Sequence, residues 1–147
     1  MLPLRLSDTS GGMHVAANLA ADVLTLLDAY PILLLKGDLG SGKTTFSQML
    51  LKQAGLEESV TSPTFNLVSE YRLPDGRTVY HFDLYRIKHA EELHELGFME
   101  YLDSGQICII EWPEIAEGLI PPPYLSLQLF HNDEQRRYVL EKHELKA

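Results

Sequence analysis

Apolar residues in the first third of the chain follow two different patterns. One set recurs at helical spacing and predicts an amphipathic helix that Pro31 ends. The residues of this helical face are Val15, Leu19, Val23, Leu26 and Leu27. Residues 7–10 precede the helix, and their side chains, those of Asp8 and Thr9 included, are of the types that cap helices. The continuous apolar run 32–35 instead predicts a short strand that is buried on both faces.

Turn signals divide the rest of the chain into short elements. Helices are predicted at residues 43–54 and 89–96, because a glycine follows each segment. Asp75-Gly76 and Asn132-Asp133 lie between paired apolar runs, which predicts two antiparallel hairpins. The remaining predicted strands span residues 4–6, 66–72, 78–82, 106–110, 125–130 and 137–142. This order predicts one α/β domain over residues 1–147, with a mostly parallel central sheet, added antiparallel hairpins and helices on both faces.

Composition and charge narrow the classes of protein. The chain has 45% apolar residues, enough for a packed core, and a net charge of −9 from 21 carboxylates against 12 lysines and arginines. We expect nucleic acid to be held by a partner, because direct binding usually needs a basic face. The single cysteine, Cys108, lies in an apolar run and predicts a buried thiol in a reducing compartment. The sequence shows no apolar leader and no membrane-length segment, so we expect a cytoplasmic protein without membrane attachment.

The segment between the strand at 32–35 and the helix at 43–54 carries the clearest chemical signal. It reads Gly37-Asp38-Leu39-Gly40-Ser41-Gly42-Lys43-Thr44 and matches G-x-x-x-x-G-K-[ST] at every fixed position. Glycines let the backbone curl so that successive N–H groups face phosphate oxygens, and the following helix directs its positive end at the same anion. We expect Lys43 to contact the β- and γ-phosphates and Thr44 to ligate Mg²⁺.

This phosphate loop predicts a P-loop NTPase-like domain that binds ATP and Mg²⁺. The alternative is a glycine-rich turn between a strand and a helix. No Asn-Lys-x-Asp signature of guanine recognition occurs in the chain, so ATP is favoured over GTP.

Two carboxylates follow predicted strands and are candidates for chemistry on the phosphates. Glu111 follows the buried strand 106–110, and Asp83 follows the strand 78–82. The carboxyl ends of parallel strands form the ligand-binding edge of such sheets. We therefore expect Glu111 to ligate Mg²⁺ and Asp83 to activate water or to lie in the outer shell of the metal. For either residue, the alternative is a surface acid at the end of a strand.

Two further positions leave alternatives open. Thr64, in Ser62-Pro63-Thr64, is either a Mg²⁺-contacting residue of a switch loop or part of an ordinary proline turn. Trp112 directly follows Glu111 and either stacks on the nucleotide base or a partner, or packs in the core.

Four segments in this order resemble the bacterial TsaE family of P-loop ATPases, which serves the biosynthesis of tRNA N6-threonylcarbamoyladenosine. They are residues 37–46, Ser-Pro-Thr-Phe at 62–65, His-Phe-Asp-Leu-Tyr-Arg at 81–86 and Glu-Trp-Pro-Glu at 111–114. The resemblance extends over about residues 4–139. The phosphate loop is generic, whereas the four segments together are specific to the family.

The resemblance implies an ATPase that acts with the TsaB and TsaD proteins, while tRNA is contacted only through these partners. Thr44 and Glu111 correspond to the metal ligands of the family, and Asp83 to its proposed catalytic acid, with Lys43 acting on the phosphates. Thr64 falls on its switch-like loop. The nucleotide contacts that the resemblance implies are Thr9, with Asp8 as its alternative, Gly37, Asp38, Leu39, Gly40, Ser41, Gly42, Lys43, Thr44, Thr45, Thr64 and Arg136.

Two other functions compete with this interpretation. A small-molecule kinase of P-loop fold would use Asp83 to deprotonate an acceptor hydroxyl, and such kinases usually carry an arginine-rich lid. The only candidate for that lid is Arg136-Arg137, within a predicted strand. A nucleotide-gated adaptor, whose ATP binding matters more than its hydrolysis, is the second alternative.

Overall fold

Seven strands of the described residues form one mixed sheet in the computed structural model, which describes residues 3–61, 67–132 and 135–145. Their order across the sheet is β1-β7-β6-β2-β5-β4-β3. β2 pairs in parallel with β5 and β6, and β4 with β5, whereas the pairs β1–β7, β6–β7 and β3–β4 are antiparallel. The predicted fold class is confirmed. The strands are β1 (Leu4–Ser10), β2 (Ile32–Lys36), β3 (Val68–Arg72), β4 (Thr78–Asp83), β5 (Ile107–Glu111), β6 (Tyr124–Asn132) and β7 (Gln135–His143).

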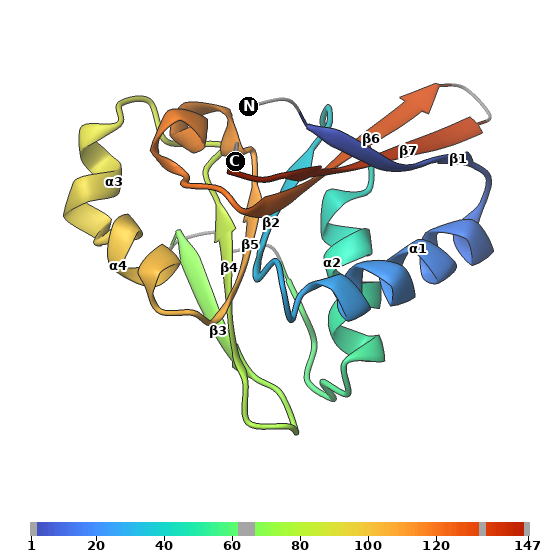
Figure 1. The fold of residues 1–147 in the computed structure, drawn as a ribbon, viewed down its shortest axis with the longest axis horizontal. Helices are drawn as coiled ribbons and strands as arrows, with labels where there is room; N and C mark the ends of the chain where they lie inside the picture. Colours follow the sequence, from blue (N-terminus) through green and yellow to red (C-terminus); the bar gives the residue numbers. More distant parts are fainter. Residues whose placement is uncertain (1–2, 62–66, 133–134, 146–147) are drawn as a thin grey trace.

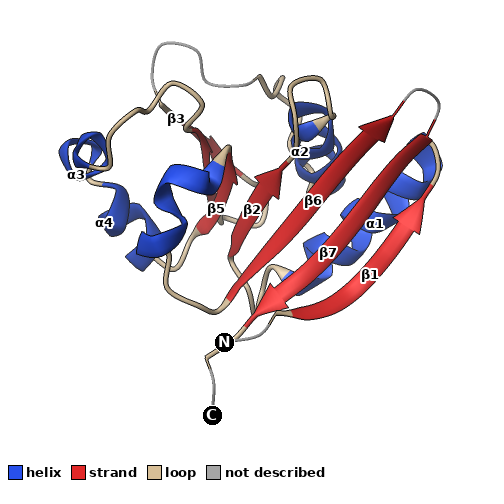
Figure 2. Ribbon diagram, turned by 90° about the horizontal axis from the view of Figure 1, so that it is seen from above, coloured by secondary structure: helices blue, strands red, loops and turns tan. Residues whose placement is uncertain are grey.

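Helices cover both faces of this sheet (Figures 1 and 2). α1 (Met13–Leu26) and α2 (Lys43–Gln53) pack on one face, and α3 (Glu91–Leu96), α4 (Phe98–Asp103) and the 3₁₀ helix η1 (Pro113–Leu119) on the other. None of the described helices is long and apolar enough to cross a membrane. Buried residues of the α1/α2 layer include Leu19, Val23, Leu33, Phe46, Leu50, Ile109 and Leu127. Those of the α3/α4 layer include Leu34, Phe82, Leu93, Phe98, Cys108 and Ile110.

The central strands alternate between these two apolar layers. On β5, Ile107 and Ile109 belong to the α1/α2 layer, while Cys108 and Ile110 belong to the α3/α4 layer. Side chains two residues apart on a strand share a face. Glu111 therefore follows Ile107 and Ile109 to the α1/α2 side at the carboxyl end of β5. Asp83 does the same on β4, where Val79 belongs to the α1/α2 layer.

The N-terminal strand corrects the prediction that residues 7–10 cap the first helix. β1 runs on through Ser10 and pairs antiparallel with β7, and the N-cap of α1 is Gly12, which makes no side-chain cap hydrogen bond. Asp8 instead accepts two hydrogen bonds from the guanidinium of Arg137, at 2.9 and 2.8 Å, and these hold the pKa of Asp8 below its usual value. The predicted strand 4–6 is part of β1, but residues 7–10 carry no apolar alternation that would predict its extension.

Helical boundaries deviate where short elements follow one another. α1 ends at Leu26, and a turn separates it from Pro31. α4 and η1 lie outside the predicted elements, because helices of six or seven residues carry too few apolar positions to show a period. Gly97, expected to stop a helix, adopts φ 76° and serves as both the C-cap of α3 and the N-cap of α4.

Candidate functional site

The phosphate loop joins the end of β2 to the start of α2. Gly42 is the N-cap of α2 with φ 102°, a left-handed conformation that favours glycine. Gly37 is required for a different reason, since a Cβ atom there would lie 2.5 Å from Oγ of Ser41 and 2.7 Å from the carbonyl oxygen of Leu129. The amino end of α2 is thereby left open toward the loop, as phosphate binding at a helix N-terminus requires.

Lys43 lies across the mouth of the loop and is almost fully buried. Its Nζ donates to the carbonyl oxygens of Gly37, at 2.6 Å, and Asp38, at 3.0 Å, and to Oγ of Ser41 at 3.4 Å. The same ammonium lies 4.0 Å from the ring centroid of Trp112. Burial lowers the pKa of Lys43, and nearby carboxylates, that of Glu111 first, oppose this shift. The side chain is a cation held at the loop by polar atoms that phosphate oxygens can replace.

Glu111 brings a carboxylate to the first turn of α2. Oγ1 of Thr44 lies 3.1 Å from Oε1 and 3.3 Å from Oε2 of Glu111, a residue that is only 2% exposed. Oε2 is also 2.5 Å from Nε2 of His81, which is fully buried on β4. The predicted pair of metal ligands, Thr44 and Glu111, is thus in direct contact.

Asp83 lies beside Glu111 because the two end neighbouring parallel strands in register. The backbone N–H of Tyr85 donates to Oδ1 of Asp83 at 3.0 Å, and the backbone N–H of Leu84 donates to the carbonyl oxygen of Glu111 at 3.1 Å. These bonds fix the chain at the point where it leaves β4. Asp83 therefore sits at the carboxyl edge of the sheet together with Glu111, as the sequence predicted.

One cavity of about 350 Å³, here called the loop cavity, contains most of the predicted site. Both carboxylates, the lysine and the threonine face it, so they can act on one ligand. The residues that line it are Leu39, Gly40, Gly42, Lys43, Thr44, Thr45, Asp83, Glu111, Trp112 and Arg136.

The donor atoms of the loop cavity suit Mg²⁺. A hydroxyl and a carboxylate supply hard oxygen ligands, and Mg²⁺ commonly takes one or two carboxylates together with waters and substrate phosphates. Among the described residues, no cluster of three or more His, Cys, Asp or Glu side chains could hold a metal ion. Thr44 and Glu111, whose oxygens are in contact, are the residues that would hold a magnesium ion beside bound phosphates.

Arg136 links the loop cavity to a second cavity, of about 370 Å³, between the end of β1 and the start of α1. A Cβ atom on Gly42 would lie 2.8 Å from Nη1 of Arg136, so the guanidinium lies directly over the loop. The second cavity is lined by residues 10–13 as well as by His131, Gln135 and Arg136. Thr9 precedes this lining on β1, where it pairs with Tyr138.

The remaining candidates divide into three groups. Asp38 and Ser41 contact Lys43 within the loop, and Leu39 is 70% exposed at its tip. Trp112 is half-buried and packs near Tyr85, with ring centroids 4.8 Å apart, so it is a wall of the loop cavity rather than a core residue. Thr64 lies outside the described residues.

His81 is the residue of this site that sequence reasoning did not single out. The signal was available, because His81 and Asp83 are two apart on one predicted strand and therefore share its face. His81 lies within an otherwise apolar run. In that position the sequence pattern favours treating a histidine as a polar interruption of the strand rather than as a site residue.

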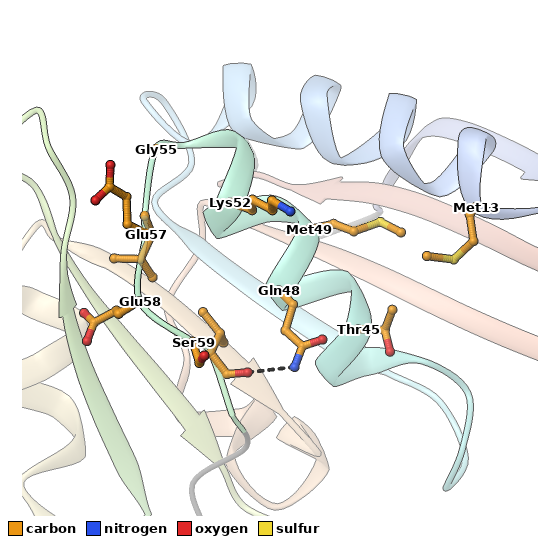
Figure 3. A pocket seen from close by; sticks show the side chains of 11 residues that line it. Met13, Thr45, Gln48, Met49, Lys52, Gly55, Glu57, Glu58 and Ser59 are labelled. Carbon is orange, nitrogen blue, oxygen red and sulfur yellow. Dashed lines mark hydrogen bonds between the residues drawn. The ribbon is translucent and has the colours of Figure 1, made fainter.

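A cavity larger than the loop cavity lies elsewhere, along α2 and the segment that follows it (Figure 3). It has a volume of about 710 Å³, and Met13 and Met49 point toward one another across one end of it. Nε2 of Gln48 donates to the carbonyl oxygen of Val60 at 2.7 Å and ties that segment to the helix. Lys43, Thr44, Asp83 and Glu111 do not line it, so its size does not mark the chemical site.

Comparison with known proteins bears on the family and the fold of this chain. A family model described as "Threonylcarbamoyl adenosine biosynthesis protein TsaE" matches residues 12–139. The crystal structure of YdiB from Bacillus subtilis superposes with a TM-score of 0.69 at 24% identity, covering 97% of this chain and 88% of that one. This last likeness establishes the fold.

Curated relatives are similar to this chain in sequence. The chain is 46% identical over 107 residues to the tRNA threonylcarbamoyladenosine biosynthesis protein TsaE of Rickettsia felis, and 41% identical over 106 residues to that of Haemophilus influenzae. Each alignment covers 72% of this chain, but only 61% of the first relative and 66% of the second. With the family model matching most of its length, this chain belongs to the TsaE family.

Proposed function

We propose that this chain binds Mg²⁺–ATP at residues 37–44 and hydrolyses it as a component of tRNA N6-threonylcarbamoyladenosine biosynthesis. The observation that carries the proposal is the convergence of Lys43, Thr44, Asp83 and Glu111 on one cavity at the amino end of α2. The relatives whose names refer to this pathway supply the biological assignment.

The binding of Mg²⁺–ATP before hydrolysis depends on the phosphate loop and on the side-chain oxygens of Thr44 and Glu111. Backbone N–H groups of residues 37–44 and the N-terminus of α2 receive the phosphates, and Lys43 exchanges its loop carbonyls for phosphate oxygens. Thr44 and Glu111 hold Mg²⁺, which when bound neutralises charge on the phosphates. The indole of Trp112 lies against Lys43 and lines the same cavity.

Asp83 is the residue that acts on the attacking water. It lines the same cavity as Lys43, and its carboxylate is held by the backbone N–H of Tyr85, which donates to Oδ1 at 3.0 Å. A carboxylate so placed can accept or orient a water proton while Glu111 remains with Thr44. Binding and hydrolysis are thereby assigned to different carboxylates.

The base and ribose of ATP fit the second cavity, at the start of α1. Arg136 lines both cavities and lies over Gly42, so a nucleotide whose phosphates occupy the loop would pass beneath its guanidinium. This arrangement supports Arg136 as a nucleotide contact and gives Thr9, just before the cavity, a place near the ligand.

The partners that we propose are the TsaB–TsaD proteins, with tRNA contacted through them. The net charge of −9 supports an indirect role in RNA binding. Thr64 remains a predicted switch-loop residue. In this scheme the partner raises the affinity for ATP by the same factor by which ATP raises the affinity for the partner.

The deciding assay combines the chain with TsaB, TsaD, tRNA, threonine, bicarbonate and ATP, and counts modified adenosines per enzyme. We expect multiple turnovers that require this chain and that disappear with Lys43→Ala. Equal turnover without the chain would refute the pathway assignment and leave ATP binding untouched.

The kinase alternative gains no support from the arginines. Arg137 is engaged by Asp8 on the exposed side of β7, and Arg136 lies on the same strand rather than on a lid. An adaptor function predicts that ATP binding suffices for activity, so Asp83→Ala would remain active in the assay above.

A further inference from the structure

His81 is a fully buried imidazole whose two ring nitrogens have different surroundings. Nε2 lies 2.5 Å from Oε2 of Glu111. Nδ1 is also buried, and it has no hydrogen-bond partner among the described residues. A buried polar atom without a hydrogen-bond partner costs free energy. The burial of His81 therefore points to a role for its other ring nitrogen.

The contact with Glu111 decides which ring nitrogen carries the proton. A carboxylate oxygen accepts, so a 2.5 Å contact requires Nε2 to donate. If the proton were on Nδ1 instead, Nε2 and Oε2 would present two lone pairs to each other, and a buried N–H group would be left unpaired. The geometry therefore places a proton on Nε2.

This bond fixes one end of the Glu111 carboxylate and leaves the other directed at α2. Oε1 is the oxygen nearer to Oγ1 of Thr44, at 3.1 Å. His81 pairs in register with Ile109, two residues before Glu111, so the donor comes from the neighbouring strand of a rigid sheet. Ligands that are oriented by hydrogen bonds from rigid elements bind metals more tightly.

We propose that His81 is a positioning residue, which holds Oε2 of Glu111 so that the carboxylate faces Thr44 and is ready to bind Mg²⁺. The inference rests on the proposed function, since it assumes that Glu111 and Thr44 serve the metal. It adds to that function a buried residue that affects the binding of Mg²⁺ and not the binding of the nucleotide by the loop. His81 is not among the residues that line the loop cavity.

Two amide substitutions separate this role from simple core packing. In His81→Gln, the side-chain NH₂ is as many bonds from Cα as Nε2 of histidine, so it can still donate to Glu111. In His81→Asn, the NH₂ takes the position of Nδ1 and cannot reach. Both variants bury an amide at the same site, so they form a matched pair that differs in reach.

The readout is the binding of fluorescent N-methylanthraniloyl-ADP at increasing Mg²⁺ and in EDTA. We expect His81→Asn to raise the half-maximal Mg²⁺ concentration by about 10-fold or more, while its affinity in EDTA equals that of the wild type. His81→Gln is expected to stay close to the wild type. A wild-type Mg²⁺ response in His81→Asn, or an equal loss in both folded variants, overturns the inference. Absent or Mg²⁺-independent binding by the wild-type chain would instead overturn the proposed function.

A measurement on the wild-type chain covers the case in which the variants do not fold. Long-range ¹H–¹⁵N spectra distinguish a protonated ring nitrogen from one with a lone pair. We expect Nε2 of His81 to carry a proton. A lone pair on Nε2 would overturn the inference whatever the variants do.

Discussion

The two faces of the central sheet are made from the same strands, yet β4 and β5 carry charge on only one of them. On the α1/α2 side, β4 and β5 present His81, Asp83 and Glu111 toward the N-terminus of α2. On the α3/α4 side the neighbouring positions are Phe82, which packs edge-on against Phe98 with ring centroids 5.3 Å apart, and Ile110. A shift of a single residue along the strand separates the polar side chains near α2 from hydrocarbon packing.

This difference shows what makes a buried carboxylate tolerable. Glu111 is 2% exposed, but a hydroxyl, an imidazole and a nearby ammonium surround it. Burying such a group without partners would cost several kcal/mol, by order of magnitude. The buried cluster around Phe82 and Ile110 on the α3/α4 side consists of apolar and aromatic side chains, with Cys108 as its thiol.

The largest expected effect comes from removing the lysine of the phosphate loop, on the α1/α2 side of the sheet. Lys43→Ala should abolish binding of a fluorescent ATP analogue while leaving the fold intact, because Nζ contacts loop oxygens and the Trp112 ring rather than core side chains. Lys52→Ala removes the same charge from the other end of α2 and is the matched control. Unchanged affinity in Lys43→Ala would remove the loop from the site.

The next effect separates the two carboxylates of the charged side. Asp83→Ala should keep ATP binding and lower hydrolysis by about 100-fold or more, because a group that orients water matters mainly in the transition state. Glu111→Ala should weaken Mg²⁺-dependent binding instead, as a metal ligand acts in the ground state. Binding titrations and single-turnover hydrolysis distinguish the two. Wild-type hydrolysis by Asp83→Ala would show that this role is wrong.

A smaller effect tests the apolar side, and it should appear in stability. Phe98→Ala should lower the free energy of unfolding by about 3–5 kcal/mol, since it empties a fully buried site against Phe82. Urea denaturation measures this loss, with Leu145→Ala, at a residue 72% exposed, as the control. We expect the folded variant to bind nucleotide with wild-type affinity. A loss below about 1 kcal/mol would contradict the packing described for this layer.

The smallest effect concerns the thiol of the apolar side. Burial raises the pKa of Cys108 to about 12, so at pH 8 only about one molecule in 10⁴ carries the reactive thiolate. The native chain should therefore resist iodoacetamide at pH 8, whereas the unfolded chain, with an ordinary thiol pKa, should react. Mass spectrometry with and without urea measures the difference. Rapid labelling of the native chain would show that Cys108 is accessible.

The sequence determined the chemistry of the loop and the elements that carry it. The spacing of Gly37, Gly42 and Lys43 depends on local backbone geometry, and the buried strands 32–35 and 106–110 are continuous apolar runs that a short window identifies. Asp83 and Glu111 were identified as strand-end acids for the same reason. The resemblance to the TsaE family rests on these local segments, and the family model matches it.

Only the tertiary structure decided how these segments meet. β1 forms because residues 4–10 find a partner about 130 residues later, in β7, and no local signal in an exposed edge strand announces that pairing. The registers of β4 and β5 bring His81 to Glu111, and the β6–β7 hairpin places Arg136 over Gly42. Local spacing fixes which residues have the right chemistry. Contacts between distant strands fix which of them share a cavity, because strand pairing depends on packing and hydrogen bonding across the whole sheet.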